Sequence, residues 1–266
     1  MTTSLLKRVE PSRLLSLAAT AVVVGLFAGI VAATFASVAG EPSIDDAIAI
    51  EEANATAHPE PDTGAVHEEE ASVSRRDQRG IGLFGAYALT GAAFGVLLAL
   101  TAHGLRRGRP DVARRVLLAG LILAGAFTVA PWFKYPPNPP AVGDPATLGE
   151  RQSLYVWLIV IAVAVGLGAT MLSRRVRAAG WADHRRIAAV AAAVAVLMLV
   201  VFAAMPPAPD PVLVPATLVW RFRVASLGAN LTLWAVLTLG VGWVVAEAAR
   251  RAGQDEAENQ LVPSLA

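Results

Sequence analysis

Long apolar runs alternate with short polar segments along the whole chain. Six of these runs contain no Asp, Glu, Lys or Arg, and together they make up more than half of the 266 residues. A bilayer core about 30 Å thick is crossed by about 20 apolar residues in an α-helix. The pattern therefore predicts six transmembrane helices, at residues 14–39, 80–104, 115–133, 153–173, 187–205 and 223–246.

These runs predict an all-α polytopic membrane protein, with residues 1–266 forming a single integral membrane domain. The composition agrees, because 55% of the residues are hydrophobic and only 16% are charged, against roughly 25% charged residues in soluble domains. A soluble enzyme, a disordered chain and a β-barrel are excluded, since barrel strands are shorter and alternate in polarity. The absence of cysteine excludes disulfides, thiolate metal sites and cysteine nucleophiles.

The basic residues predict the orientation of the spans, because cytoplasmic segments collect Lys and Arg. Most of the 22 basic residues lie before the first span, in the second and fourth links, and in the tail at 247–266. We therefore expect a multi-pass protein of the bacterial cytoplasmic (inner) membrane with both termini in the cytoplasm. The first run also fits a signal peptide, but it is longer than the usual apolar core of about 7–15 residues, and we expect it to be retained.

Two of the outward links resemble each other. Residues 136–151 read PPNPPAVGDPATLGER and residues 206–221 read PPAPDPVLVPATLVWR, so both fit PPxPxxxxxPATLxxR. Proline stiffens an extended segment, and we expect the PATL stretch to begin a helix. The pattern predicts duplicated units of helix, proline-rich loop and helix, an internal repeat of a kind that is common in transporters.

The link at residues 41–79 is the only long polar segment, and it is acidic. Imidazole and carboxylate groups together suit Co²⁺, Ni²⁺ and Zn²⁺, and an acidic arm outside the membrane concentrates cations. The candidate metal ligands in this link are His58, His67, Glu68, Glu69 and Glu70. The alternative, which these residues alone favour, is a solvated disordered loop.

Polar residues also mark an outer mouth beside the proline-rich links. The residues of this predicted mouth are Asp144, Glu150, Arg151, Asp210 and Arg221. We expect the two arginines to pair with the three acids and so to hold the loops in place.

The predicted spans themselves contain no acidic residue. Asn230 is the most notable polar residue inside a span, and we expect it to form a hydrogen bond to another helix. Gly25 and Gly29 have the GxxxG spacing, as do Gly91 and Gly95, and this spacing allows close helix packing. No Walker A, HExxH, GxSxG or dinucleotide-binding motif occurs. We therefore expect no enzyme activity, no catalytic residues, no bound cofactor and no nucleic-acid partner.

Two segments carry a family resemblance. The first has Ala130-Pro131, the prolines within 136–140, and LGERQ at 148–152; the second has FRVASL at 222–227, followed by Asn230, Trp234, Gly240 and Trp243. In these segments, and in its basic start, long first span and acidic link, the chain resembles the CbtA family of cobalt transporter subunits. The resemblance covers nearly the whole chain. It implies a membrane subunit for cobalt uptake, with transported Co²⁺ as the substrate and no ATPase in the same chain.

The resemblance also implies a partner, a small single-span subunit called CbtB that carries a histidine-rich tail. Family members tend to have histidine near the end of the third span and in the last outer loop, where this chain has Thr128 and the run at 205–210. Asp144, Glu150 and Asp210 could supply oxygen ligands instead, although carboxylates alone favour harder ions such as Mg²⁺. Five spans are usual for the family, against the six predicted here.

Three interpretations stay open at this point. In the leading one, the chain is a divalent-metal transport subunit for Co²⁺: the acidic link captures the ion, the outer mouth receives it and the repeated helix pairs form the path. In the second, the chain is a non-transporting membrane scaffold whose repeats and GxxxG faces assemble a partner complex. In the third, the chain transports another substrate and the acidic link plays no part.

Overall fold

The computed structural model describes residues 2–57, 74–105, 111–140, 142, 145–209, 212 and 214–261. The regular secondary structure of this part of the chain is helical, with no strand. Six of its helical segments are long and apolar enough to cross a membrane. The prediction of an all-α protein with six membrane-length helices is therefore confirmed. The duplicated units and the limits of the spans stay predictions.

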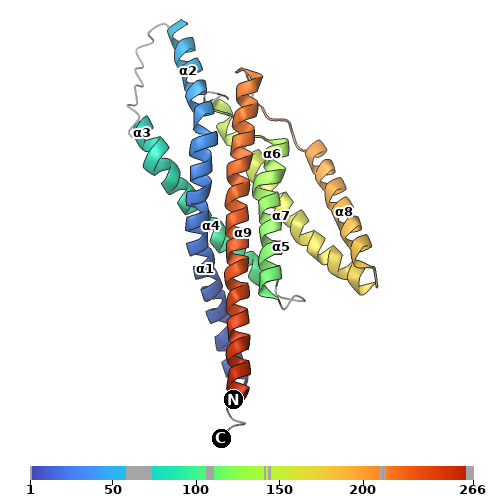
Figure 1. Ribbon diagram of the computed structural model, residues 1–266. Helices are drawn as coiled ribbons and strands as arrows, with labels where there is room; N and C mark the ends of the chain where they lie inside the picture. Colours follow the sequence, from blue (N-terminus) through green and yellow to red (C-terminus); the bar gives the residue numbers. More distant parts are fainter. Residues whose placement is uncertain are drawn as a thin grey trace. The chain divides into compact units, whose positions relative to one another are not determined.

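Figure 1 shows the helices in chain order. The longer helices are α1 (Thr2–Ala39), α4 (Leu83–Gly104), α7 (Leu148–Ala178), α8 (Asp183–Ala204) and α9 (Ala216–Leu261). The shorter ones are α2 (Glu41–Ala57), α3 (Arg75–Asp77), α5 (Val112–Ala124) and α6 (Ala130–Lys134). Single turns of other types occur at Gln78–Gly82 and Gly125–Val129, which are π-helical, and at Pro145–Thr147, which is 3₁₀.

The chain divides into two compact units. The first comprises 1–35, 75–121 and 231–266, and the second comprises 36–74 and 122–230. Because α1, α5 and α9 each contribute residues to both units, the packing of each unit is described on its own.

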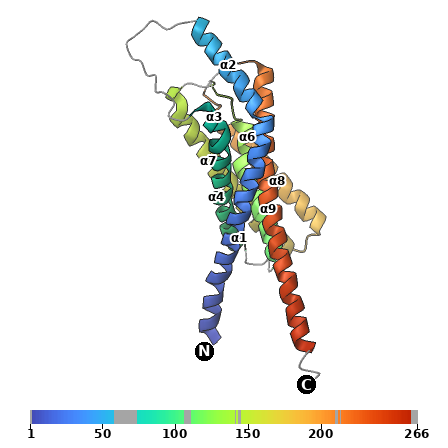
Figure 2. The same cartoon turned by 60° about the vertical axis from the view of Figure 1, so that its left-hand side comes forward.

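In the first unit, α1 and α4 pack side by side with their backbones in contact (Figure 2). A Cβ atom on Gly25 would clash with the backbone of Gly91, and one on Gly91 would clash with the backbone of Gly25. Gly29 and Gly95 face the backbone of the other helix just as closely. Both GxxxG pairs therefore lie in one seam between α1 and α4, in agreement with the close packing that their spacing allows.

The later part of α9 completes the packing of the first unit. Trp234 is only 2% exposed, and its ring stacks on Phe94 of α4 with 4.6 Å between the ring centroids. Gly120 of α5 faces the side chain of Thr238 so closely that a Cβ atom would not fit. Small and aromatic residues thus let α9 pack against both α4 and α5.

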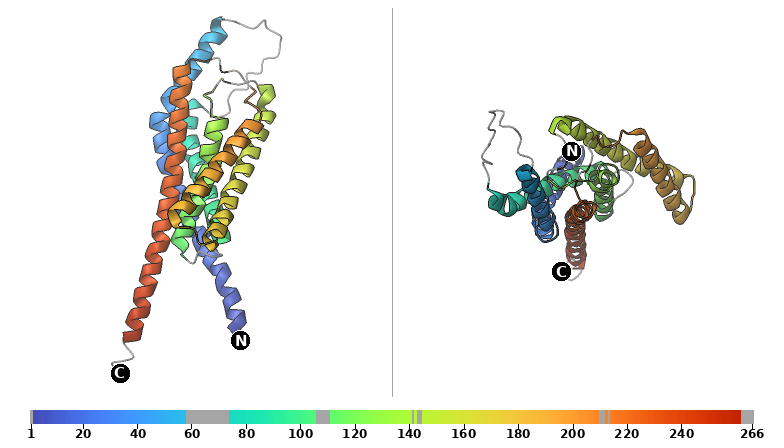
Figure 3. Two further views of the ribbon diagram at one scale, coloured as in Figure 1. Left: turned by 90° about the vertical axis from the view of Figure 1, so that its right-hand side faces the viewer. Right: turned by 90° about the horizontal axis from the view of Figure 1, so that it is seen from above.

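In the second unit, α7 and α8 run side by side as a hairpin (Figure 3). The turn between them contains Gly180 at φ +80°, a backbone conformation that favours glycine. The buried core of this unit includes Ala126, Ala130 and Ala162, whose small side chains let the π-helical turn and α6 lie close to α7.

Candidate functional site

A cavity in the second unit lies between α6, α7, the start of α9 and the proline-rich segment that follows α6. Its volume is about 540 Å³. Its walls are partly aromatic, with Trp132, Tyr135 and Tyr155 among them. The polar side chains that line it are Thr128, Asn138, Arg151, Gln152, Ser226 and Asn230.

A π-helical turn shapes one wall of this cavity. Pro131 has no backbone N–H, so it cannot bond the carbonyl of Phe127 four residues earlier, as a regular α-helix requires. The hydroxyl of Tyr155 donates a hydrogen bond to this carbonyl at 3.4 Å instead. The resulting turn, Gly125–Val129, places Phe127 and Thr128 on the cavity wall. Such π-turns are found frequently at functional sites.

Arg223 fixes the proline-rich segment that closes the cavity. Its Nη2 donates to Oδ1 of Asn138 at 2.7 Å, and its Nε donates to the carbonyl of Pro137 at 3.3 Å. Its own carbonyl accepts a hydrogen bond of 3.0 Å from Nε1 of Trp132. Because of these three bonds, α6, the proline-rich segment and α9 hold one another in place.

The end of α6 is joined to the end of α8 in a similar way. Nζ of Lys134 donates to the carbonyls of Phe202 and Met205, both at 2.8 Å. Cations favour such positions, because the last carbonyls of a helix have no intrahelical partner. The hydroxyl of Tyr135 donates to the carbonyl of Pro206 at 2.8 Å. Burial raises the pKa of Tyr135 above its usual 10.0, so this hydroxyl stays a donor well above neutral pH.

Asn230 lines the cavity, but its hydrogen bond differs from the predicted one. Its Nδ2 donates to the carbonyl of Ser226 on the same helix at 2.9 Å, and the expected bond to another helix stays a prediction. The carbonyl four residues earlier is always within reach of a helical side chain, and the facing side of α9 here is the open cavity.

The first part of the acidic link is a helix, not a loop. Residues 41–57, expected to belong to a flexible arm or a disordered loop, form α2. Acidic residues at its start stabilise the helix dipole, and its alanines favour helix. Glu41, Ser43 and Ala47 are buried, so the base of α2 is packed rather than free.

Arg221 pairs with a different acid from those predicted. Its Nη2 lies 2.6 Å from Oδ2 of Asp46 on α2. The two side chains are 57% and 53% exposed, and exposed pairs of this kind contribute only about 0–1 kcal/mol. Among the acids expected to pair with it, Glu150 is exposed in the first turn of α7. The prediction missed Asp46 because it treated the acidic link as having no fixed structure.

Comparison with known proteins decides the family. A family model described as "Probable cobalt transporter subunit (CbtA)" matches residues 14–246. The chain belongs to the CbtA family. The match covers most of the chain and includes every residue that lines the cavity, and it confirms the resemblance seen in the sequence. No curated protein and no solved structure matches the chain.

Within this CbtA chain, several predicted site residues cannot be placed. His58, His67, Glu68, Glu69 and Glu70 lie outside the described residues, and so do Asp144 and Asp210. They stay predictions. Among the residues that the structure does describe, no three His, Cys, Asp or Glu side chains come together in a group that could hold a metal ion.

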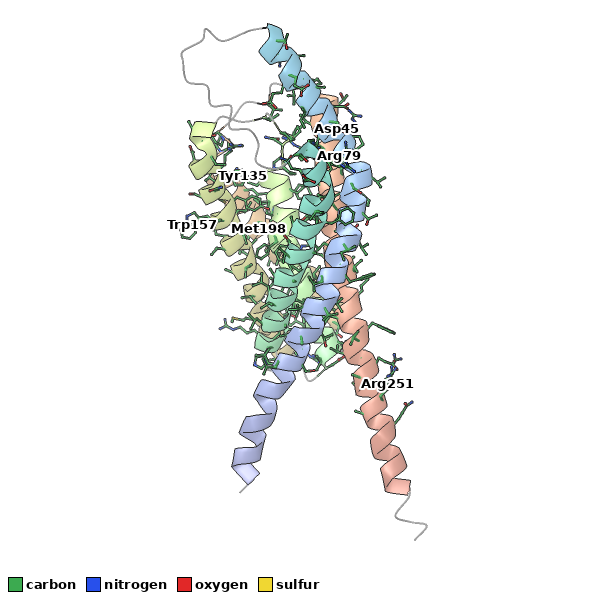
Figure 4. The ribbon with its side chains drawn as sticks, turned by 90° about the vertical axis from the view of Figure 1, so that its left-hand side faces the viewer. Asp45, Arg79, Tyr135, Trp157, Met198 and Arg251 are labelled. Carbon is green, nitrogen blue, oxygen red and sulfur yellow. The ribbon has the colours of Figure 1, made fainter. Side chains whose placement is uncertain are left out.

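The aromatic residues that line the cavity cannot be distinguished, from the sequence, from aromatic residues at the membrane surface. Trp132, Tyr135 and Tyr155 lie near the ends of the predicted spans, where aromatic residues are typical of a belt at the membrane surface, but all three line the cavity. Trp157 is 62% exposed and points away from the helices of its unit (Figure 4). The sequence held one signal for Tyr155, which is Pro131, because a proline leaves the carbonyl of Phe127 one turn earlier in need of a donor.

Proposed function

We propose that this chain is the membrane subunit of a cobalt uptake system in the bacterial cytoplasmic membrane, with both termini in the cytoplasm and no catalytic activity of its own. The observation that carries the proposal is the CbtA family match over residues 14–246, on a chain with six membrane-length helices. Co²⁺ is the transported substrate.

The cavity in the second unit is not the place where the cation first binds. Among the described residues that line it there is no Asp, Glu, His or Cys, whereas Arg151 is present. A guanidinium is always charged and repels a divalent cation. The neutral oxygens of Thr128, Ser226 and Asn230 can hydrogen-bond the water shell of an ion in transit.

We therefore place capture on α2 and the segment that follows it. This helix carries five acids and no basic residue; the acids are Glu41, Asp45, Asp46, Glu51 and Glu52. Its base is held by burial and by the bond from Arg221 to Asp46, while its far end is exposed. The next residue in the chain is His58. A fixed acidic helix leading to a segment with imidazole and carboxylate groups would raise the local cation concentration and offer ligands that suit Co²⁺.

The captured ion would then pass to the outer mouth. We propose that Asp144, Glu150 and Asp210 receive it there, beside Arg151 and Arg221. A CbtB-like subunit with a histidine-rich tail would complete the set of nitrogen ligands, because the described part of this chain assembles none.

The deciding experiment is cobalt accumulation in cells. Cells that express the chain, with and without a CbtB-like subunit, are compared with an empty vector at submicromolar Co²⁺, with Ni²⁺ and Zn²⁺ as competitors. We expect saturable uptake above the vector and strongest competition by the ion closest to Co²⁺ in ligand preference. Uptake equal to the vector, with the protein present in the membrane, would refute transport.

The capture step has its own test. The double variant His58→Ala/His67→Ala is expected to lower uptake several-fold at limiting cobalt and to leave it unchanged at saturating cobalt, because it removes ligands but not the path. The matched control is His103→Ala/His184→Ala, which removes the other two histidines. Equal uptake by both double variants at limiting cobalt would remove the capture segment from the mechanism without refuting transport.

A further inference from the structure

A second cavity lies between α7 and α8 and has apolar walls. Its volume is about 390 Å³. The residues that define it include Ile161, Val165, Gly168 and Leu172 of α7, and Ala193 and Leu197 of α8. No polar side chain lies among the described residues that line it. We call this cavity the hairpin groove.

The groove is open because its walls are built from small residues. A Cβ atom added to Gly168 would meet nothing within 4 Å, so the backbone of α7 leaves unfilled space there. On the other side, α8 has no buried residue anywhere along its length. Beyond its contact with α7, most of the surface of this apolar helix is exposed in the chain, so it faces the hydrocarbon of the membrane.

The dimensions of the groove fit a hydrocarbon chain. From Ile161 to Leu172 is eleven residues, which spans about 16 Å at the helical rise of 1.5 Å per residue. This length approaches that of one lipid acyl chain, since two such chains end to end fill a core about 30 Å thick.

Two arginines stand at one end of the groove. On α7, Arg175 follows Leu172 by three residues and so lies on the same helix face as the groove lining. On α8, Arg186 precedes Ala193 by seven residues, or two turns, and also lies on the lining face. Both positions lie next to the turn that joins the helices, one on each wall. Arg175 is exposed, and the side chain of Arg186 is 15% exposed.

The formal charge at this end of the hairpin is positive by four, because residues 173–187 contain five arginines and one acid, Asp183. Asp183 pairs with Arg186 at 3.1 Å, and its side chain is 80% exposed. This pair is neutral as a whole, and Arg175 is the other arginine at a position that continues the lining of the groove. Trp181, which is 49% exposed in the turn, is of the type that lies at the depth of lipid headgroups.

We propose that the hairpin groove binds an anionic phospholipid, with an acyl chain between α7 and α8 and a monoanionic headgroup at Arg175 and Arg186. The apolar groove supplies affinity for the chain, and the arginines supply the preference for negative charge. This site is separate from the proposed cobalt path, so each can fail without the other.

The test uses the purified full-length chain in a neutral detergent. Its thermal unfolding midpoint is measured with phosphatidylglycerol, with phosphatidylcholine of the same acyl chains, and with soluble glycerol phosphate. We expect phosphatidylglycerol to raise the midpoint by several degrees more than phosphatidylcholine does, and glycerol phosphate to have no effect. An equal effect of the two lipids would overturn the headgroup site, and an effect of glycerol phosphate alone would overturn the role of the groove.

Matched variants separate this site from a general attraction to basic residues. Arg175→Gln/Arg186→Gln should abolish the preference for phosphatidylglycerol. Arg177→Gln/Arg185→Gln removes the same charge from the same end of the hairpin, on other faces of the helices, and should retain the preference. Equal losses in both would mean that only the surface charge matters.

Two further variants test the groove and guard against misfolding. Gly168→Leu fills the open space and should remove the stabilisation by lipid, whereas Ala195→Leu, on the exposed side of α8 away from the groove, should not. Asp183→Asn removes the competing carboxylate and should increase the preference for phosphatidylglycerol. Because a damaged protein would not gain such a preference, an unchanged or weaker response in Asp183→Asn would contradict the proposal.

Discussion

Arg223 holds together more of the second unit than any neighbouring side chain on the same stretch of α9. Its guanidinium bonds the proline-rich segment at Pro137 and Asn138, and its carbonyl receives Trp132. Arg221, two residues earlier, makes one exposed ion pair with Asp46. The two arginines have the same charge but differ in burial and in the number of partners.

This difference predicts unequal effects of the same substitution. Arg223→Met leaves the partly buried acceptors of Asn138 and Pro137 unpaired, at a cost of about 1.5–3 kcal/mol for hydrogen bonds to a charged group. Arg221→Met is expected to cost about 0–1 kcal/mol. Denaturant unfolding of the two purified variants measures the difference, and similar losses would show that the bonds of Arg223 do not hold the unit together. The bond from Trp132 goes to the backbone and is retained in both variants.

The close packing of α1 against α4 is a helix contact that the sequence predicted. The GxxxG spacing of Gly25 with Gly29, and of Gly91 with Gly95, placed small residues on one face of each helix, and these faces meet each other within the chain. The scaffold interpretation needed the same faces for a partner. Since these faces already pack against each other within the chain, they do not support the scaffold interpretation.

The seam predicts opposite outcomes for two glycine substitutions in α4. Gly91→Ala puts a methyl group against the backbone of α1, so the helices must separate, at a cost of about 1–3 kcal/mol. Gly85→Ala has no atom within 4 Å of the new methyl group and should be neutral or stabilising by up to about 1 kcal/mol. Thermal unfolding in detergent measures both, and a stable Gly91→Ala variant would mean that the seam can open without cost.

Helix existence could be predicted from the sequence because a backbone inside a bilayer must satisfy its own hydrogen bonds. The hydrogen-bond and ion-pair partners of the side chains could not be predicted in this way. Asp46 and Arg221 are 175 residues apart, and their bond depends on how α2 packs, which composition does not reveal. Acidity made residues 41–57 resemble a loop, although alanine and an acidic first turn favour helix. For Trp132 and Tyr155, the sequence indicates depth in the membrane but not which way the ring faces.

For the whole molecule, charge segregation predicts the topology. The missing cysteines make this prediction easy to test, because a single introduced cysteine is the only site for a maleimide. Glu52→Cys on α2 is expected to react with a membrane-impermeant maleimide in intact cells. Arg250→Cys near the end of α9 should react only after the membrane is permeabilised. The reverse pattern would invert the orientation, and labelling of both in intact cells would contradict the odd number of crossings, five, predicted between them.

The bonds made by Lys134 also impose an order on assembly. The carbonyls that this side chain binds lie 68 and 71 residues further along the chain. At a synthesis rate of about 5–20 residues per second, α6 exists for several seconds before its acceptors are made. The ammonium group of Lys134 must stay in water during this interval. The end of α6 therefore cannot reach its final packed position until α8 has been inserted. Arg223 emerges later still, and the proline-rich segment is locked last. The second unit therefore takes its final form only near the end of translation.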